Sequence, residues 1–168
     1  MIKPNEFLDF LKGRRTIRSF QDKAVTEEHI EMILEAGRWA PSASNRQPWE
    51  FIIVKNREIL YKISKTGTYG LPLRKAPLGI AIIGKKLENP NWYIQDTSLV
   101  SMNMMLMAWA LNIGMCWIGS MDREYAKELL GLGNDDFLLT ILAAGYIKGK
   151  IPKPTLRKNL EDLTRILK

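Results

Sequence analysis

The sequence predicts an α+β or α/β domain with helices packed against a central sheet, and three observations point to this class. Short apolar runs typical of strands alternate along the chain with longer segments of helical periodicity. Residues that commonly cap helices precede several of these segments. The 168 residues, 46% hydrophobic and 26% charged, are typical of a globular protein with a real core. We therefore exclude disordered and fibrous classes and expect residues 1–168 to form one domain.

The N-terminal part of the chain predicts two helices. Residues 4–12 have an amphipathic helical pattern, in which Pro4 suits the first position and Gly13 suits the end. A second helical pattern runs to about Trp39, and Thr26 can cap its start. The stretch between these two helices has no periodicity of its own.

A loop, a strand and a third helix follow. Residues 40–49 predict a loop, because two prolines bracket small hydroxyl and amide residues. The apolar run Trp49–Val54 predicts a strand, and Asn56 can cap a helix that ends near Ser64. Residues 65–76 contain two glycines and a proline, so this segment is the candidate for a mobile part of the chain.

The next elements are strongly apolar. Residues 77–84 predict a strand that is buried on both faces. Residues 96–111 predict a helix that is apolar nearly all round and thus enclosed by protein, and its methionines favour core or subunit packing over a ligand surface. Residues 115–120 form a short apolar run, after which Asp122 can cap a helix that ends near Leu130.

The last third of the chain changes character at residue 150. The apolar run 137–147 predicts a central strand. Beyond it, residues 150–158 are basic and rich in proline, and residues 160–167 form a short amphipathic stretch. We therefore expect the chain to end in a basic arm.

The charge and the rare residue types limit the function. The net charge of +7 favours an anionic partner, but a phosphorylated cofactor needs only a few of these charges. Nucleic-acid binding is a weaker alternative, because aromatic residues do not interleave with the basic stretches. The single cysteine, Cys116, rules out an intrachain disulfide and fits a reducing cytoplasm, and no segment predicts a signal peptide or a membrane span. We therefore expect a cytoplasmic protein.

Catalysis by side chains alone finds little support in the sequence. The only histidine, His29, falls on the exposed side of its helical pattern and is interpreted as a surface residue. One histidine and one cysteine predict no metal site and leave little room for a nucleophile with a histidine base. The segment Gly131–Asn134 lacks the third glycine and the preceding strand of a dinucleotide fingerprint. If the protein is an enzyme, a cofactor supplies the reactive chemistry.

The stretch Arg14–Phe20 is the strongest candidate for a ligand site. Arg14 and Arg15, with the Thr16 hydroxyl, form a compact set of donors suited to a phosphate, since a guanidinium offers forked donors and keeps its charge. Arg18 can face another part of the same ligand. Taken alone, the stretch is better explained as a solvated basic loop.

Three stretches together resemble the nitroreductase family of FMN-dependent oxidoreductases. They are Arg14–Phe20, the loop and strand start at 40–51 with its Gln-Pro-Trp sequence, and the Gly-Met-Cys-Trp-Ile-Gly segment at 114–119. The resemblance covers nearly the whole chain. It implies a three-layer α+β fold with a mixed, mainly antiparallel sheet, and a homodimer whose subunits share their sites. It also implies that the arm 150–168 reaches the partner subunit.

The resemblance assigns roles to the arginines. Residues that match Arg14, Arg15 and Thr16 hold the FMN phosphate and ribityl chain, and the residue that matches Arg18 lies near the N1–O2 edge of the flavin. Arg157 matches a basic residue that also contacts the phosphate. Where many relatives have a further lysine, this chain has Thr155, which implies a thinner phosphate clamp.

The resemblance also assigns the remaining contacts. The loop near residue 42 is implied to reach FMN across the dimer interface, and the backbone near residue 118 is implied to face flavin N5. A proximity argument adds Lys158. The cofactor-binding residues expected in addition to the arginines and Thr16 are Pro41, Ser42, Ala43, Ser44, Asn45, Ile118, Gly119 and Lys158.

The function implied is electron transfer in two half-reactions, from NADH or NADPH to FMN and then to a small organic acceptor such as a nitro compound or a quinone. No side chain need act as a general base. Reductive dehalogenation and flavin fragmentation occur on the same fold and are alternatives, because a fold does not settle the chemistry. A non-catalytic protein that stores or senses FMN is a further alternative.

Overall fold

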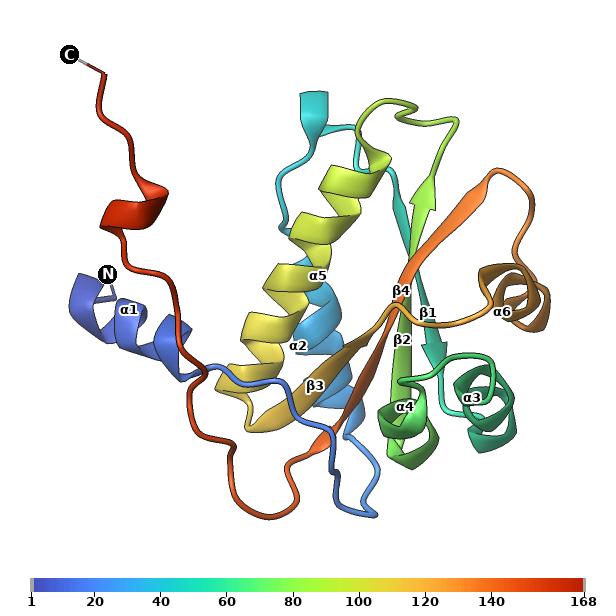
Figure 1. Cartoon of the computed structure of the whole chain (residues 1–168). Helices are drawn as coiled ribbons and strands as arrows, with labels where there is room; N and C mark the ends of the chain where they lie inside the picture. The colour runs from blue at the N-terminus through green and yellow to red at the C-terminus, as the bar shows by residue number, and fades with distance from the viewer. Residues whose placement is uncertain (1, 168) are drawn as a thin grey trace.

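The computed structural model describes residues 2–167, which form a four-stranded sheet with helices on both faces (Figure 1). The spatial order of the strands is β1–β2–β4–β3, and all three pairings are antiparallel. The predicted α+β fold is therefore confirmed, with β4 inside the sheet as expected for a central strand. The strands are β1 (Trp49–Val54), β2 (Leu78–Lys85), β3 (Ile113–Ile118) and β4 (Asp136–Tyr146).

Helices form the two outer layers (Figure 1). Helices α2 and α5 pack on each other and cover one face, while α3, α4 and α6 cover the other. The helices are α1 (Pro4–Gly13), α2 (Glu27–Arg38), α3 (Arg57–Ser64), α4 (Leu71–Lys75), α5 (Tyr93–Ala110) and α6 (Arg123–Leu130), with 3-10 turns η1 (Ala43–Asn45) and η2 (Glu161–Leu163).

Three predicted helix caps are present. The Asn56 and Asp122 side chains accept hydrogen bonds from the backbone N–H of Glu58 (2.9 Å) and Tyr125 (3.1 Å). The Thr26 hydroxyl accepts a longer bond of 3.4 Å from the backbone of α2. Each cap satisfies an N–H that the helix itself leaves without a partner, which explains why these helices start where they do.

The core has two halves, one on each side of the sheet. Along β2, Ile80 and Ile82 face α2 and α5, whereas Ala81 and Ile83 face α3 and α4. All four residues are fully buried, so the prediction of a strand covered on both faces is confirmed. This double burial fixes the register of β2 and hence the positions of its neighbours.

Two predictions made for single segments are wrong. Five residues of the segment 65–76, which was predicted to be mobile, form α4, and the Leu73 side chain is fully buried. His29 is partly buried rather than exposed, because its Nδ1 lies 3.0 Å from the Tyr146 hydroxyl. In both places a contact with a distant strand or loop decides the environment, and local periodicity does not report such contacts.

Helix α5 begins at Tyr93, three residues earlier than predicted, and is not enclosed on all sides by its own chain. Val100 and Met104 are fully buried, but Leu99 and Met102 remain exposed. The expected core packing is therefore present on one side of the helix, and coverage of the exposed side by a second copy stays a prediction. None of the helices described within residues 2–167 is long and apolar enough to cross a membrane.

The two ends of the chain lie together at one side of the molecule. Helix α1 has no buried residue, and the arm that follows residue 150 runs past it and away from the body (Figure 1). All described residues of this arm are exposed, and Leu156 is 99% exposed. The expected C-terminal arm is thus present as a separate extension.

Candidate functional site

The stretch after α1 is attached to the edge of the sheet. Thr16 pairs with Met115 of β3 in a parallel bridge, and the Ile17 N–H donates to the Met115 carbonyl at 3.0 Å. Ile17 and Phe20 are buried. The close contact of Ile17 depends on Gly114 of β3, because a Cβ at that position would overlap the Ile17 side chain. These contacts fix the backbone from which the arginines project.

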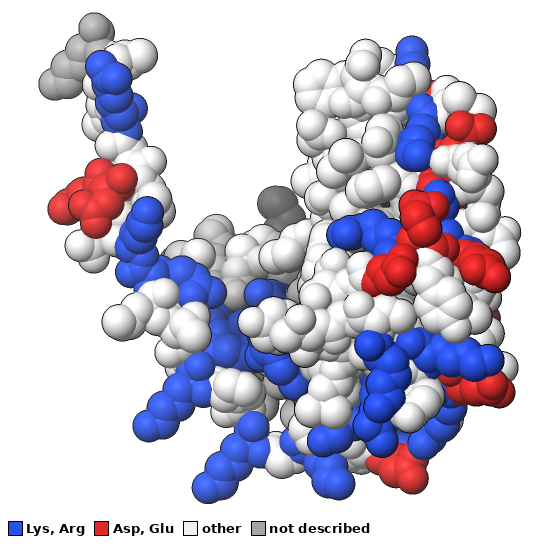
Figure 2. Space-filling model, turned by 45° about the vertical axis from the view of Figure 1, so that its right-hand side comes forward, with Lys and Arg blue, Asp and Glu red and all other residues white. Residues whose placement is uncertain are grey.

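A basic cavity of about 780 Å³ lies between this stretch and the start of the C-terminal arm. Blue side chains gather around the base of the arm in Figure 2. Arg14 and Arg18 meet Arg157 here, so the expected convergence of the two chain ends is present. No Asp or Glu lines the cavity, whose described lining residues are Leu11, Lys12, Arg14, Arg15, Thr16, Arg18, Pro152, Lys153, Pro154, Thr155 and Arg157.

Two guanidinium nitrogens of arginines that line this cavity have no hydrogen-bond partner among the described residues. Arg14 Nη1 and Arg15 Nε are both buried, and neither has an acceptor among the described residues. A second nitrogen of Arg15, Nη1, donates hydrogen bonds to the nearby backbone carbonyls of Lys12 (2.6 Å) and Arg14 (2.8 Å). Buried donors without acceptors are rare and costly, so this arrangement favours an anionic ligand with several oxygen acceptors.

The electrostatics of the cavity agree with this interpretation. Burial lowers the pKa of Arg14, and the positive charges of Arg15 and Arg157 lower it further. Arginine keeps its charge under all physiological conditions, so the three guanidinium groups repel one another. A bound anion would relieve this repulsion and return hydrogen bonds to the buried donors.

A second cavity lies at the end of β3 and shares Arg18 with the basic cavity. Its volume is about 330 Å³, and Ile118 and Gly119 line it as expected. Burial raises the pKa of the Cys116 thiol there, and the Arg18 charge opposes this shift. The other lining residues of this second cavity are Tyr69, Cys116, Trp117 and Ser120.

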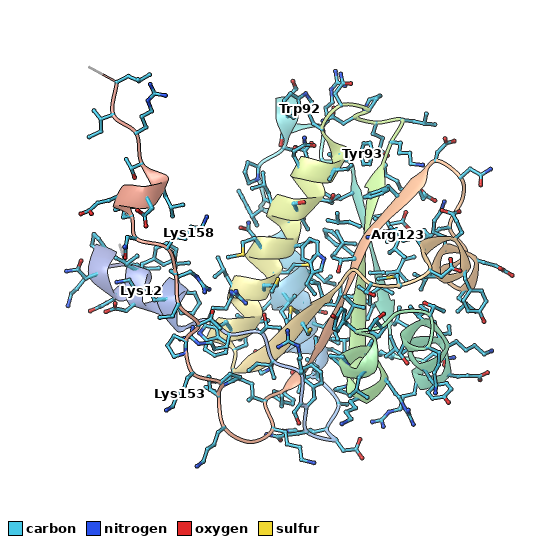
Figure 3. All side chains as sticks on the ribbon, in the orientation of Figure 1. Lys12, Trp92, Tyr93, Arg123, Lys153 and Lys158 are labelled. Atoms are coloured by element: carbon cyan, nitrogen blue, oxygen red, sulfur yellow. The ribbon has the colours of Figure 1, made fainter. Side chains whose placement is uncertain are left out.

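The expected residues Pro41–Asn45 are not near either of these cavities in the same chain. Turn η1 lies at one end of α5, beside Trp92 and Tyr93, whereas Lys12 and Lys153 mark the basic cavity on the other side (Figures 1 and 3). Within the loop, the Ser42 hydroxyl accepts a hydrogen bond from the Gln47 N–H at 2.9 Å. One chain alone therefore does not bring together all the residues that the sequence singles out.

Some assignments differ from the sequence-based expectation. Lys158 is exposed and is not among the residues that line either cavity, whereas Lys12 and Lys153 line the basic one. The basic composition of residues 150–158 pointed to this region, but it could not show which of the lysines there lines the cavity. Tyr69 was missed because its segment offered no motif, although the structure places it on the wall of the second cavity.

A separate groove of about 790 Å³ is lined mainly by apolar side chains of α2 and α5. Met32 and Trp39 are exposed in it, and Glu31 and Glu35 provide negative charge at its border. The Glu35 carboxylate accepts hydrogen bonds from Arg38 and Trp39, which lowers its pKa to about 2. The remaining lining residues are Phe10, Ala36, Asn103, Leu106, Met107 and Ala110.

Comparison with known proteins gives consistent matches. The model of the family described as the nitroreductase family matches residues 11–66 and 65–146. A protein of Archaeoglobus fulgidus, named as a proposed NADH dehydrogenase/NAD(P)H nitroreductase, is 37% identical over 150 residues, which cover 85% of this chain and 86% of that protein.

Two solved structures share both sequence and fold with this chain. An FMN-dependent nitroreductase from Clostridium difficile R20291 is 33% identical with a TM-score of 0.81, over 92% of this chain and 93% of that one. A proposed nitroreductase from Desulfovibrio desulfuricans, solved in complex with FMN, is 29% identical with a TM-score of 0.85, over 98% and 96% of the two chains.

Proposed function

Since the chain belongs to the nitroreductase family, we propose that it is an FMN-dependent oxidoreductase that passes electrons from NADH or NADPH to a small organic acceptor in two half-reactions. The observation that carries the proposal is the basic cavity itself, whose lining arginines include two buried guanidinium nitrogens without acceptors among the described residues. Bound FMN would supply the electron-transfer chemistry that the side chains of this protein lack.

The residues of the basic cavity fit the phosphate end of FMN. A phosphate monoester carries a charge of about −1.5 to −2 and several strong acceptor oxygens. Arg14, Arg15 and Thr16 would hold it from one end of the chain, and Arg157 from the other. These contacts would provide the acceptors that the buried nitrogens need, so the same step that binds the cofactor also removes an energetic cost of the fold.

Arg18 has a different proposed role, because it lines both cavities. Its fixed positive charge would stabilise the negative charge that a flavin gains on reduction. A guanidinium does not deprotonate at working pH, so this effect would persist across the pH range of the enzyme. The backbone of Ile118 and Gly119 borders the same cavity and would approach the ring.

We further propose a homodimer in which Pro41–Asn45 of one copy complete the site of the other. The separation of this loop from the basic cavity within one chain supports this arrangement. The apolar groove on α2 and α5 and the exposed leucines of the arm are surfaces that a second copy would cover. The arm is basic and the groove border is acidic, so their charges are complementary.

A flavin titration tests the proposal. The purified protein should bind one FMN per chain, and NADH or NADPH should bleach the bound flavin without oxygen. Arg14→Ala with Arg15→Ala should weaken binding at least about tenfold, because two donors to the phosphate are lost. Arg18→Ala should slow bleaching more than it weakens binding. Lys62→Ala, which removes a positive charge on α3 away from the cavity, serves as the matched control.

Three results would contradict the proposal in different ways. Absence of FMN binding by the wild type would contradict the whole proposal. Binding without bleaching by either nucleotide would instead favour storage or sensing of FMN. Equal losses of binding and bleaching in Arg18→Ala would show that Arg18 only anchors the cofactor. Reductive dehalogenation and flavin fragmentation are separated from simple electron transfer by the products formed with each acceptor.

A further inference from the structure

The loop between α2 and β1 has an unusual backbone. Ser44, Asn45 and Gln47 all have left-handed conformations, with φ values of 53°, 54° and 52°. Such values are uncommon for residues other than glycine, and Asn tolerates them better than Ser or Gln. Local preference alone would not select three of them within four residues, so hydrogen bonds within the loop, such as Gln47 N–H to the Ser42 hydroxyl, and contacts from outside it hold this shape together.

The main outside contact comes from Asp96, in the first turn of α5. One carboxylate oxygen accepts a hydrogen bond from the Ala43 N–H at 3.2 Å, and the other accepts from the Asn89 side-chain amide at 3.0 Å. Asp96 and Asn89 are each only 3% exposed. A buried carboxylate is stable only when hydrogen bonds compensate its lost hydration, so its geometry is well defined. Helix α5 is in turn fixed by its buried side against the sheet.

We propose that Asp96 is a positioning residue for the flavin site of the partner subunit. It holds the Ala43 N–H and thereby maintains the left-handed turn that presents Ser44 and Asn45 to FMN in the other copy. This inference rests on the proposed function and on the proposed dimer. Asp96 itself touches neither cofactor nor substrate, because its two oxygens are used within its own chain.

A simpler interpretation is that Asp96 only stabilises α5, where an acidic residue in the first turn favours the helix dipole. The two interpretations differ in what Asp96→Asn should do. The amide keeps one oxygen acceptor for the Ala43 N–H and removes the charge, and its NH2 group can bond to Asn89 once the Asn89 side-chain amide turns over to present its oxygen. Rescue by Asn therefore indicates that the hydrogen bond to the loop is the important contact.

The experiment measures FMN affinity by quenching of flavin fluorescence in Asp96→Ala, Asp96→Asn and a control. Asp96→Ala should bind FMN at least about tenfold more weakly, because the loop loses its buried acceptor. Asp96→Asn should stay within about threefold of the wild type. Ser98→Ala is the control, since the Ser98 hydroxyl donates only to the Ile94 carbonyl of its own helix among the described residues. Thermal melts and the oligomeric mass of each variant are measured in parallel.

A mixed dimer tests whether the loop acts on the other subunit. One differently tagged chain carries Asp96→Ala and the other carries Arg14→Ala with Arg15→Ala. If Asp96 serves the partner's site, the mixed dimer contains one intact site and recovers one high-affinity FMN. Placing all three substitutions on one chain, with a wild-type chain as partner, should leave no intact site.

Each result supports or overturns the inference. The inference is overturned if Asp96→Ala binds FMN with wild-type affinity, or if the first mixed dimer does not recover a high-affinity site. In either case the proposed function still stands. Absence of FMN binding in the wild type overturns both this inference and the proposed function. A monomeric wild type overturns both this inference and the proposed dimer. If Asp96→Ala does not fold, Ala43→Pro removes the N–H that Asp96 accepts from. The preceding residue, Ser42, has an extended backbone (φ −140°, ψ 156°), which is compatible with a proline at position 43. Undiminished FMN affinity in that variant also overturns the inference.

Discussion

Arg14 shows the cost of a binding site at the scale of one residue. Its guanidinium is partly removed from water, stands near two other positive groups, and has one nitrogen without an acceptor. A buried donor without a partner costs about 1–3 kcal/mol, which a fold selected only for stability would avoid. The cost is understandable if the residue is selected for an anion that arrives later. The neighbouring Arg15 repeats the same arrangement.

Cys116 provides a prediction that does not depend on turnover. The thiol is 4% exposed, and burial raises its pKa, so less of the reactive thiolate is present at neutral pH than for a free cysteine. Alkylation should therefore be slow, and its rate should reach half-maximum at a higher pH than that of a free thiol. Because Cys116 lines the cavity next to Arg18, saturating FMN should slow alkylation further, by at least about threefold.

The measurement follows alkylation by mass spectrometry from pH 7 to 10, with and without FMN. Riboflavin at the same concentration is the control, since it has the ring but lacks the phosphate. An unchanged rate with FMN would mean that the cofactor does not cover the end of β3. A rate that reaches half-maximum below the pH of a free thiol would contradict the role of burial.

At the scale of elements, the arginine stretch depends on a glycine of the neighbouring strand. A side chain at Gly114 would overlap Ile17, whose N–H is bonded to β3. Gly114→Ala should therefore displace the stretch, destabilise the fold by about 1–3 kcal/mol and weaken FMN binding. Gly133→Ala is the matched control, because the nearest atom to its added Cβ is 3.7 Å away. Denaturant unfolding and FMN titration of both variants would check this, and equal stability of the two would contradict it.

Local elements could be predicted from the sequence because local chemistry determines them. Thr26, Asn56 and Asp122 cap helices through side chains that lie next to the N–H groups they satisfy. The position of His29 could not be predicted, since its partner Tyr146 is far away in the sequence. Helix α4 was missed because its five residues are too few to show periodicity and tertiary packing decides their conformation.

The site was only partly predictable for the same reason. The arginines and Thr16 were found as a contiguous motif, and the family resemblance added Arg157, Ile118 and Gly119, each of which lines one of the two cavities. The contribution of Lys12 and Lys153 arises from the path of the arm, and the role proposed for Asp96 arises from a fold contact with Ala43. The basic composition of the arm indicates the region of Lys153 but does not single out this lysine, and the contact between Asp96 and Ala43 leaves no signal in composition or spacing.

At the scale of the whole molecule, the surfaces left uncovered by one chain are those expected of a dimer. The exposed leucines of the arm, the exposed side of α5 and the groove beside α2 all lie outside the core. An isolated apolar residue on a surface is normal, but a groove and an extended arm together indicate an interaction surface. The proposed sharing of sites gives this surface a function, because neither basic cavity would be complete without the other chain.

The arm provides the last prediction. Leu156, Leu160 and Leu163 are 99%, 78% and 65% exposed in one chain, so replacing all three with serine should leave the stability of a single subunit nearly unchanged. If a second copy buries them, each contributes about 1.5–3 kcal/mol to association, and the dimer should dissociate at least about a hundredfold more readily. FMN affinity should fall in parallel, because Arg157 lies on the same arm. Sedimentation over a range of concentrations measures the dissociation constant, and Leu87→Ser, which changes a leucine that is 75% exposed outside the arm, is the control. If the triple variant and the control dissociate equally, the arm does not hold the two copies together.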